Sequence, residues 1–126
     1  MERAFIAIAS ILGGLSVGGG AFTSHALKER LSEKALAIFE TGVKYQMYHA
    51  LALLFVAILL SRGEIPREFL TATGIAFIVG IIIFSGSLYA LSLTGIKWLG
   101  AITPLGGVAF LLGWGCLAVA ALKAVS

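Results

Sequence analysis

The sequence predicts an all-α, polytopic membrane protein, a four-transmembrane-helix bundle with a short amphipathic segment between helices 1 and 2. Of the 126 residues, 60% are hydrophobic and only 12% are charged, whereas roughly 25% of residues in soluble domains are charged. The mean hydropathy is +1.05. The apolar runs are continuous rather than alternating, and a bilayer admits only helices and closed barrels. We therefore expect one helical membrane domain over residues 1–126.

Three of the four spans follow from the positions of the charges. A helix needs about 20 predominantly apolar residues to cross the hydrocarbon core. Uncharged runs of that length lie between Arg3 and Lys28, between Glu68 and Lys97, and between Lys97 and Lys123. They predict spans at about residues 4–24, 69–93 and 98–122.

The second span is predicted at about residues 43–61 and begins with polar side chains. Its strongly apolar part is short, and four polar or aromatic residues precede it: Tyr45, Gln46, Tyr48 and His49. The helix therefore has to enter the membrane around Val43 to be long enough.

Residues 26–41, which precede that span, form an amphipathic segment. Their apolar side chains fall on one helical stripe and their charges fall elsewhere. This pattern indicates either an interfacial helix or an aqueous extension of the second span. Because Ser32 followed by Glu33 resembles a helix N-cap with an acid in the first turn, we favour a break near Leu31 followed by one long helix.

An even number of spans places both termini on one side of the membrane. That side carries four basic residues and the other side carries five, so the positive-inside rule is nearly balanced. The count alone favours external termini. Arg3 flanks the first helix, however, and Arg62 and Arg67 share a short loop, so we predict that the termini are cytoplasmic.

Small residues predict close helix packing. In lipid, helices associate because small side chains let their backbones approach. Gly14 and Gly18 form a GxxxG pair, and Pro104 lacks a backbone N–H and predicts a kink near Thr103. This pattern indicates either packing within one chain or an oligomer interface. The predicted packing residues are Gly14, Gly18, Gly86, Pro104 and Gly107.

Polar side chains within the spans gather at the end of the bundle opposite the termini. A candidate polar site comprises His25, Glu40, Tyr45, Gln46 and His49. At 1.5 Å per residue, His49 lies about 7 Å inside Lys44, a depth at which ionisable groups usually face the bundle interior or a water-filled cavity. One interpretation is a neutral His49 that hydrogen-bonds to a tyrosine or the backbone and locks two helices. The others are a metal ligand, a proton relay or a headgroup contact, with His25 nearby and Glu40 as the nearest third ligand.

Several function classes are disfavoured. The nine Lys and Arg lie between apolar runs, where they mark membrane edges or meet lipid headgroups, so no nucleic acid is expected. Cys116 is the only cysteine in the sequence, so the chain can form neither an internal disulfide nor a CxxC metal site. We predict the lipid bilayer as the surroundings of the protein, and no metal or cofactor.

Five short motifs resemble one small membrane protein family. They read GAFTSHAL at residues 20–27, FETGVKYQMYHALALL at 39–54, FSGSLY at 84–89, ITPLGG at 102–107 and GW at 113–114. In this order they resemble domain of unknown function family 423, a mainly bacterial four-span family with a mitochondrial relative. Thr23 and Ser24 stand where the family often has Gly-Ala, a departure expected to alter the packing near His25. The resemblance implies a multi-pass protein of the bacterial inner (plasma) membrane or a related internal membrane, and no established reaction.

The absence of a recognisable catalytic set makes a non-enzymatic function the main hypothesis. The protein is predicted to pack with partners, as a homo-oligomer or as an accessory subunit of a larger membrane complex. The alternative is a transporter of small molecules or ions, or a lipid- or quinone-binding protein, with its site around His49. An enzyme would need positioned titratable groups, and His49 is the only such group well inside a span.

Overall fold

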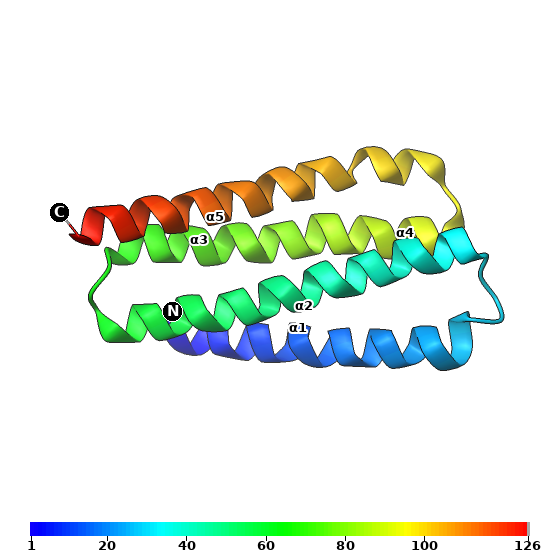
Figure 1. The fold of residues 1–126 in the computed structure, drawn as a ribbon, viewed down its shortest axis with the longest axis horizontal. Coiled ribbons are helices and arrows are strands. Elements are labelled where there is room, and N and C mark those ends of the chain that lie inside the picture. Colours follow the sequence, from blue (N-terminus) through cyan, green and yellow to red (C-terminus); the bar gives the residue numbers. More distant parts are fainter. Residues whose placement is uncertain (126) are drawn as a thin grey trace.

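The protein is an antiparallel helical bundle (Figure 1). The computed structural model describes residues 1–125, and of Val125 the backbone alone. Two π-helical turns (η1 and η2) and one 3₁₀ turn (η3) interrupt the α-helices. In chain order the elements are α1 (Glu2–Phe22), η1 (Thr23–Leu27), α2 (Glu33–Arg62), α3 (Arg67–Gly80), η2 (Ile81–Ser85), α4 (Gly86–Thr94), η3 (Lys97–Ala101) and α5 (Thr103–Val125).

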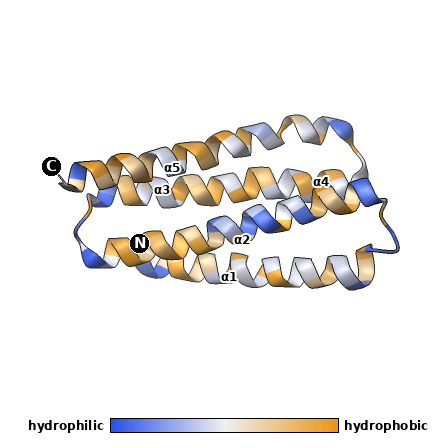
Figure 2. Cartoon of the chain, in the orientation of Figure 1, coloured by the Kyte–Doolittle hydropathy of each residue, from blue (hydrophilic) through white to orange (hydrophobic). Residues whose placement is uncertain are grey.

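Within residues 1–125, four helical runs are long and apolar enough to cross a membrane: Glu2–Leu27, Glu33–Arg62, Arg67–Thr94 and Lys97–Ala124. The shortest has 26 residues and is about 39 Å long, which exceeds the hydrocarbon core of about 30 Å. Figure 2 shows hydrophilic residues at the ends of the bundle and in one further stretch of α2. The predicted four-span, all-α fold is confirmed.

The amphipathic segment is the beginning of α2. Ser32 has extended backbone, and its hydroxyl accepts a hydrogen bond from the backbone N–H of Ala35 at 3.1 Å, as an N-cap does. From Glu33 the helix continues for 30 residues. Of the two alternatives that the sequence left open, the long continuous helix is the one observed, and the break lies in residues 28–32.

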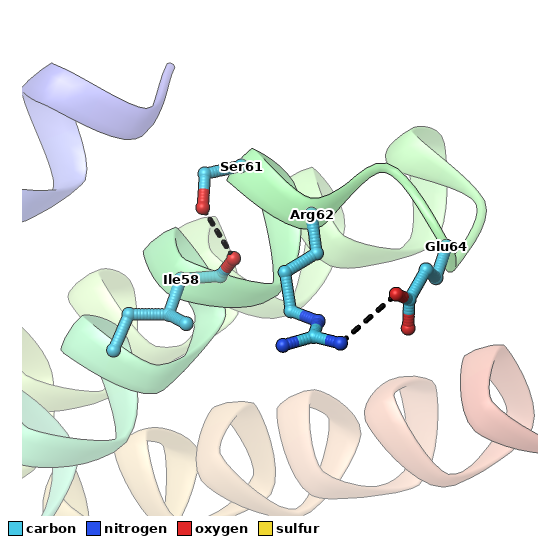
Figure 3. Close-up of polar contacts among 4 residues, drawn as sticks. All are labelled: Ile58, Ser61, Arg62 and Glu64. Atoms are coloured by element: carbon cyan, nitrogen blue, oxygen red, sulfur yellow. Dashed lines mark hydrogen bonds and ion pairs between the residues drawn. The ribbon is translucent and has the colours of Figure 1, made fainter.

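At its other end α2 stops before Gly63. The φ angle of Gly63 is +72°, a left-handed conformation that glycine adopts without steric cost. Figure 3 shows this helix end: the Ser61 hydroxyl donates to the carbonyl of Ile58 at 2.6 Å, and Arg62 pairs with Glu64 at 3.0 Å. Both charged side chains are exposed, so this pair contributes little to stability.

The two ends of the bundle differ in what they carry. Both termini and the loop of residues 63–66 lie at one end, which we call the termini end, and the loops of residues 28–32 and 95–96 lie at the two-loop end (Figure 1). An ion pair between Arg67 and Glu2 ties the start of α3 to the N-terminus. α2 is the central helix, packing against α1, α3 and α4, while α5 packs mainly on α3.

The apolar core fills the half of the bundle nearer the termini end. Phe5 of α1 fits against Gly74 of α3, where an added Cβ would overlap its ring. The side chains around it interdigitate as in the interior of any close-packed protein. The buried cluster comprises Phe5, Ala9, Ala52, Leu53, Val56, Ala57, Leu60, Leu70, Phe77, Ile81 and Phe110.

Glycines bring neighbouring helices of the chain close together. A Cβ added at Gly14, Gly18, Gly86 or Gly107 would meet no atom within 4 Å, so these four do not make tight contacts within the chain, and their packing against another chain stays a prediction. The tight contacts within the chain are made by Gly19 against Val43 and by Gly42, Gly74, Gly80, Gly106 and Gly113, each against an aromatic residue of a neighbouring helix. The spacing of small residues predicts a helix face that another helix can approach closely. It does not predict whether that face points into the bundle or toward the lipid.

Pro104 lies at the start of a helix rather than in the middle of one. The chain enters the fourth span as the 3₁₀ turn η3, and α5 begins at Thr103. Pro104 therefore occupies the first turn of α5, where its missing N–H leaves no hydrogen bond unmade. The irregularity expected near Thr103 is this change of helix type.

Candidate functional site

Half of the buried polar residues in the described part of the chain bond only within their own helix: Ser16, Thr23, Thr73 and Ser92. Thr73 donates to the carbonyl of Phe69 at 2.9 Å, and Thr23 to that of Gly19 at 2.8 Å. Such bonds satisfy a hydroxyl in an apolar medium without involving another helix. The side chains that link different spans lie mainly between the middle of the bundle and the two-loop end: Gln46, His49, Ser85, Ser87, Tyr89, Thr103 and Trp114. Toward the termini end, the thiol of Cys116 in α5 lies 3.7 Å from the carbonyl oxygen of Phe69 in α3.

His49 connects α2 to α5. It is 5% exposed, and its ring stacks on Phe110 with a centroid distance of 3.6 Å and an interplanar angle of 10°. The edge of Phe77 lies against it, with centroids 5.3 Å apart. Nδ1 lies 2.8 Å from the carbonyl oxygen of Tyr45, and Nε2 lies 3.0 Å from Nε1 of Trp114.

These two hydrogen bonds determine the protonation of His49. The indole N–H of Trp114 only donates, so Nε2 of His49 has to accept and carries no proton. The carbonyl of Tyr45 only accepts, so Nδ1 carries the proton. The imidazole is therefore neutral, and both nitrogens are in use. A metal ion at Nε2 would first have to displace Trp114.

Gln46 connects three helices. Its Nε2 donates to the carbonyl of Leu12 in α1 at 2.7 Å, and its Oε1 accepts from the hydroxyl of Tyr89 in α4 at 2.6 Å. The Leu12 carbonyl also accepts from the hydroxyl of Ser16 at 2.9 Å. Because Gln46 is almost fully buried, these bonds are made where no water competes for them.

A glycine lets α2 and α4 approach closely beside this network. A Cβ added at Gly42 would lie 2.7 Å from the ring of Tyr89, and the carbonyl of Gly42 accepts from the hydroxyl of Ser85 at 2.7 Å. The same region holds a hydrogen bond of 2.6 Å between Ser87 and Thr103. Polar bonds therefore join all four spans between the middle of the bundle and the two-loop end.

The five predicted site residues do not form one cavity. Tyr45 and His49 face α5, and the Tyr45 ring packs on Phe84 with centroids 4.8 Å apart. Gln46 faces α1 and α4 instead. The side chains of His25 and Glu40 are exposed, and His25 lies on the π-helical turn η1.

Sequence reasoning missed the partners of the two buried polar residues. Trp114 and Tyr89 lie 65 and 43 residues from His49 and Gln46. Both stand in short motifs of the sequence, and Trp114 interrupts an otherwise featureless apolar run. Tryptophan and tyrosine carry polar atoms that need a hydrogen-bond partner inside a bundle. The presence of Trp114 in an apolar span was therefore the one sequence feature that could have indicated a polar contact there.

A groove of about 380 Å³ runs along the outer side of His49. Its walls are almost entirely apolar and aromatic, and it opens toward the surroundings of the helices rather than along the bundle axis. It is lined by Tyr45, His49, Phe84, Pro104, Gly107, Val108, Phe110, Leu111 and Trp114. An apolar ring or chain fits such a lining, whereas a hydrated ion finds no oxygen cage in it.

Two general features bear on the chemistry available. Within residues 1–125, no three side chains of the types His, Cys, Asp and Glu gather as a metal site would require. Every buried side-chain nitrogen or oxygen in the described part of the chain has a hydrogen-bond partner. The interior polar groups are thus bonded to one another and to the backbone.

Comparison with known proteins places the chain in a family. The model of the family described as protein of unknown function (DUF423) matches residues 19–107. The chain is 48% identical to UPF0382 membrane protein YwdK of Bacillus subtilis, over 96% of this chain and 98% of the relative. It is 42% identical to a UPF0382 membrane protein of Staphylococcus epidermidis (96% and 97% covered) and 37% identical to one of Haemophilus influenzae (100% and 99% covered). These relatives are named as membrane proteins, and none of the three names is that of an enzyme.

No solved structure is significantly similar to the chain. The protein is an integral membrane protein that belongs to the DUF423 family.

Proposed function

We propose that this protein is a non-catalytic helix-packing protein of the bacterial inner membrane, which acts as a homo-oligomer or as an accessory subunit of a larger complex. The interior supports this because every buried side-chain nitrogen or oxygen in the described part of the chain has a hydrogen-bond partner, and half of the buried polar residues bond to another helix. His49 and Gln46, the two side chains best suited to chemistry, each use both of their polar atoms in such contacts.

The observation that carries the proposal is the outward face of α1. α1 packs mainly against α2, and its opposite side is exposed. A stripe of exposed residues, small except for Ile11, follows that side at alternating spacings of three and four: Ala4, Ala7, Ile11, Gly14, Gly18 and Ala21. Gly14 and Gly18 meet no atom within 4 Å.

Such a stripe suits another transmembrane helix. Helices in lipid gain little from burying apolar surface, so close backbone contact at small residues stabilises their association. A monomer would leave this exposed stripe of α1 against lipid. A second copy of α1, or a helix of a partner subunit, would fill it.

Substituting Gly14 and Gly18 by isoleucine tests this proposal. The change adds bulk where the chain itself has open space, so the monomer should fold normally, while the assembly seen by native mass spectrometry of the mildly extracted protein should be lost. Gly115→Ile is the matched control, since Gly115 is also exposed with no atom within 4 Å. A monomeric wild-type protein, or an assembly that survives the double substitution, would refute the proposal.

The orientation belongs to the same proposal, with both termini in the cytoplasm. Arg3 lies in the first turn of α1, Arg62 ends α2 and Arg67 begins α3, all at the termini end, and positive charge in short loops is retained on the cytoplasmic side. A C-terminal fluorescent-protein fusion should be bright in cells, and an alkaline phosphatase fusion at the same place inactive. The reverse pair of results would invert the orientation.

The groove beside His49 favours a second candidate function, the binding of an apolar small molecule such as a quinone or a lipid chain. Gly107 lines this groove, and an added Cβ there meets nothing within 4 Å. Gly107→Leu should fill the groove without disturbing the fold. Loss of a co-purifying small molecule from this variant, detected by native mass spectrometry, would support the candidate. A wild-type protein that carries no such molecule would refute this second candidate function.

A further inference from the structure

A second groove, of different character, lies at the two-loop end. It runs between the first turns of α2 and the turn that joins α4 to η3, and its volume is about 450 Å³. Charged and hydroxyl side chains line it together with apolar ones: Ser32, Lys34, Ile38, Leu91, Ser92 and Lys97. The groove beside His49 contains no charged side chain, so the two grooves suit different ligands.

Two lysines that are far apart in the sequence meet at this groove. Lys34 lies in the first turn of α2, and Lys97 begins η3. Both are exposed, and neither pairs with a carboxylate of residues 1–125. Glu33 is adjacent to Lys34 in the chain but does not form an ion pair with it. Two lysine side chains therefore line one groove, and no carboxylate of residues 1–125 forms an ion pair with either.

Ser32 adds a hydrogen-bond donor on the same wall. Its hydroxyl oxygen accepts from the N–H of Ala35 at 3.1 Å, which leaves its own proton available to an acceptor in the groove. Ser32 is also the N-cap of the 30-residue helix α2, where the helix dipole favours negative charge. The lining thus offers two cations and a hydroxyl donor to an anion.

This groove lies at the level of the membrane where lipid headgroups are expected. Trp98, next to Lys97, is 65% exposed, and exposed tryptophans of membrane proteins sit at the boundary between headgroups and hydrocarbon. Ile38 and Leu91, one turn or more toward the bundle centre from the lysines, give the groove an apolar inner part. The groove is therefore cationic at its outer part and apolar at its inner part.

We propose that this groove binds an anionic phospholipid, with the phosphate between Lys34 and Lys97 and the beginning of an acyl chain along Ile38 and Leu91. A free phosphate ion shares the first part of this chemistry but makes no use of the apolar wall. Phosphatidylglycerol, which has one net negative charge, fits both parts. Phosphatidylcholine carries its own cation and should be disfavoured by the two lysines.

The test is native mass spectrometry of the full-length protein from nanodiscs that contain equal amounts of phosphatidylglycerol and phosphatidylcholine. The wild-type protein should retain phosphatidylglycerol preferentially. Each lysine near anionic lipid strengthens binding, so K34Q/K97Q should lower the retention of phosphatidylglycerol by about tenfold or more. K34R/K97R keeps both positive charges and should retain most of this lipid. Both lysines are exposed, so the variants should fold, which circular dichroism checks.

The matched control is K28Q/K44Q, which removes the same charge from the same end of the bundle but outside this groove. An equal loss in control and test variants would overturn the proposal, because it would mean general charge attraction. Equal retention of the two lipids by the wild type would do the same. Displacement of phosphatidylglycerol by millimolar inorganic phosphate would assign the site to a free anion. None of these results depends on the oligomeric state.

Discussion

The two halves of this bundle are held together in different ways. Toward the termini end, apolar side chains such as Phe5, Leu53 and Leu70 fill the space between helices, and the hydroxyl of Thr73 bonds only within its own helix. From the middle of the bundle toward the two-loop end, Gln46, Ser85 and Trp114 make hydrogen bonds from one helix to another. Grooves open on the outer surface of that half.

This difference reflects what lipid allows. Apolar contact between helices replaces equally apolar contact with lipid, so it stabilises only where shapes fit closely. Hydrogen bonds tolerate a looser fit, because a polar atom in hydrocarbon needs a partner wherever that partner lies. The termini half is thus specified mainly by shape, and the two-loop half by polar pairing together with close contacts at Gly42 and Gly106.

The largest effect is expected from Gly106→Ala. An added Cβ at Gly106 would overlap the backbone of Phe84, and a backbone cannot move aside as a side chain can. Overpacking of this kind costs about 2–3 kcal/mol of unfolding free energy, measurable by titration with denaturing detergent. The neighbouring Gly107→Ala is the control, since its Cβ meets nothing, and it should not destabilise. Equal stability of the two variants would show that α5 packs differently.

An intermediate effect is expected from Gln46→Leu. The substitution removes the bonds to Leu12 and Tyr89 and leaves the Tyr89 hydroxyl without its acceptor. Interhelical hydrogen bonds in membranes contribute about 0.6 kcal/mol each and up to about 1.7, so we expect a loss of about 1–2 kcal/mol. Thr73→Val in the termini half removes only a bond within one helix and should cost less than about 0.5 kcal/mol. Equal costs would abolish the distinction between the halves.

The smallest effect is expected from Trp114→Phe. The change keeps a ring in place but removes the donor to Nε2 of His49, at a cost of about 0.6 kcal/mol. Nitrogen-15 NMR of histidine-labelled protein should show a protonated Nδ1 and an unprotonated Nε2 for His49, with the Nε2 signal shifting in the variant. The exposed His25 supplies a reference signal in the same sample. A wild-type His49 protonated at Nε2 would contradict the assigned hydrogen bonds.

The membrane fold could be predicted from the sequence because it depends on features that short stretches of sequence show directly. Runs without charge locate the spans, and Ser32 marks the start of α2 by its capping chemistry. The burial of His49 also followed from its depth in a span. These features are local, and each depends on only a few neighbouring residues.

The rotation of each helix about its axis was not predictable. Nearly every residue of α5 is apolar, so no polar stripe distinguishes an inward face from an outward one. For that reason Trp114 was not identified as the partner of His49, and Gly107 was expected at a helix contact that Gly106 makes instead. The outward direction of Gly14 and Gly18 on α1 was hidden in the same way.

The length of α2 has a consequence for the surrounding bilayer. Thirty residues make a helix about 45 Å long, about 15 Å more than the thickness of the hydrocarbon core. The other three runs have 26 to 28 residues, so every span is longer than the hydrocarbon core is thick. Charged residues occur through the first turns of α2, and Lys44 lies deepest among them, about 16 Å along the helix from Glu33. A thicker membrane would therefore bring hydrocarbon to the exposed Lys44 first, and the fit of α2 to its bilayer depends on how far this side chain reaches toward the headgroups.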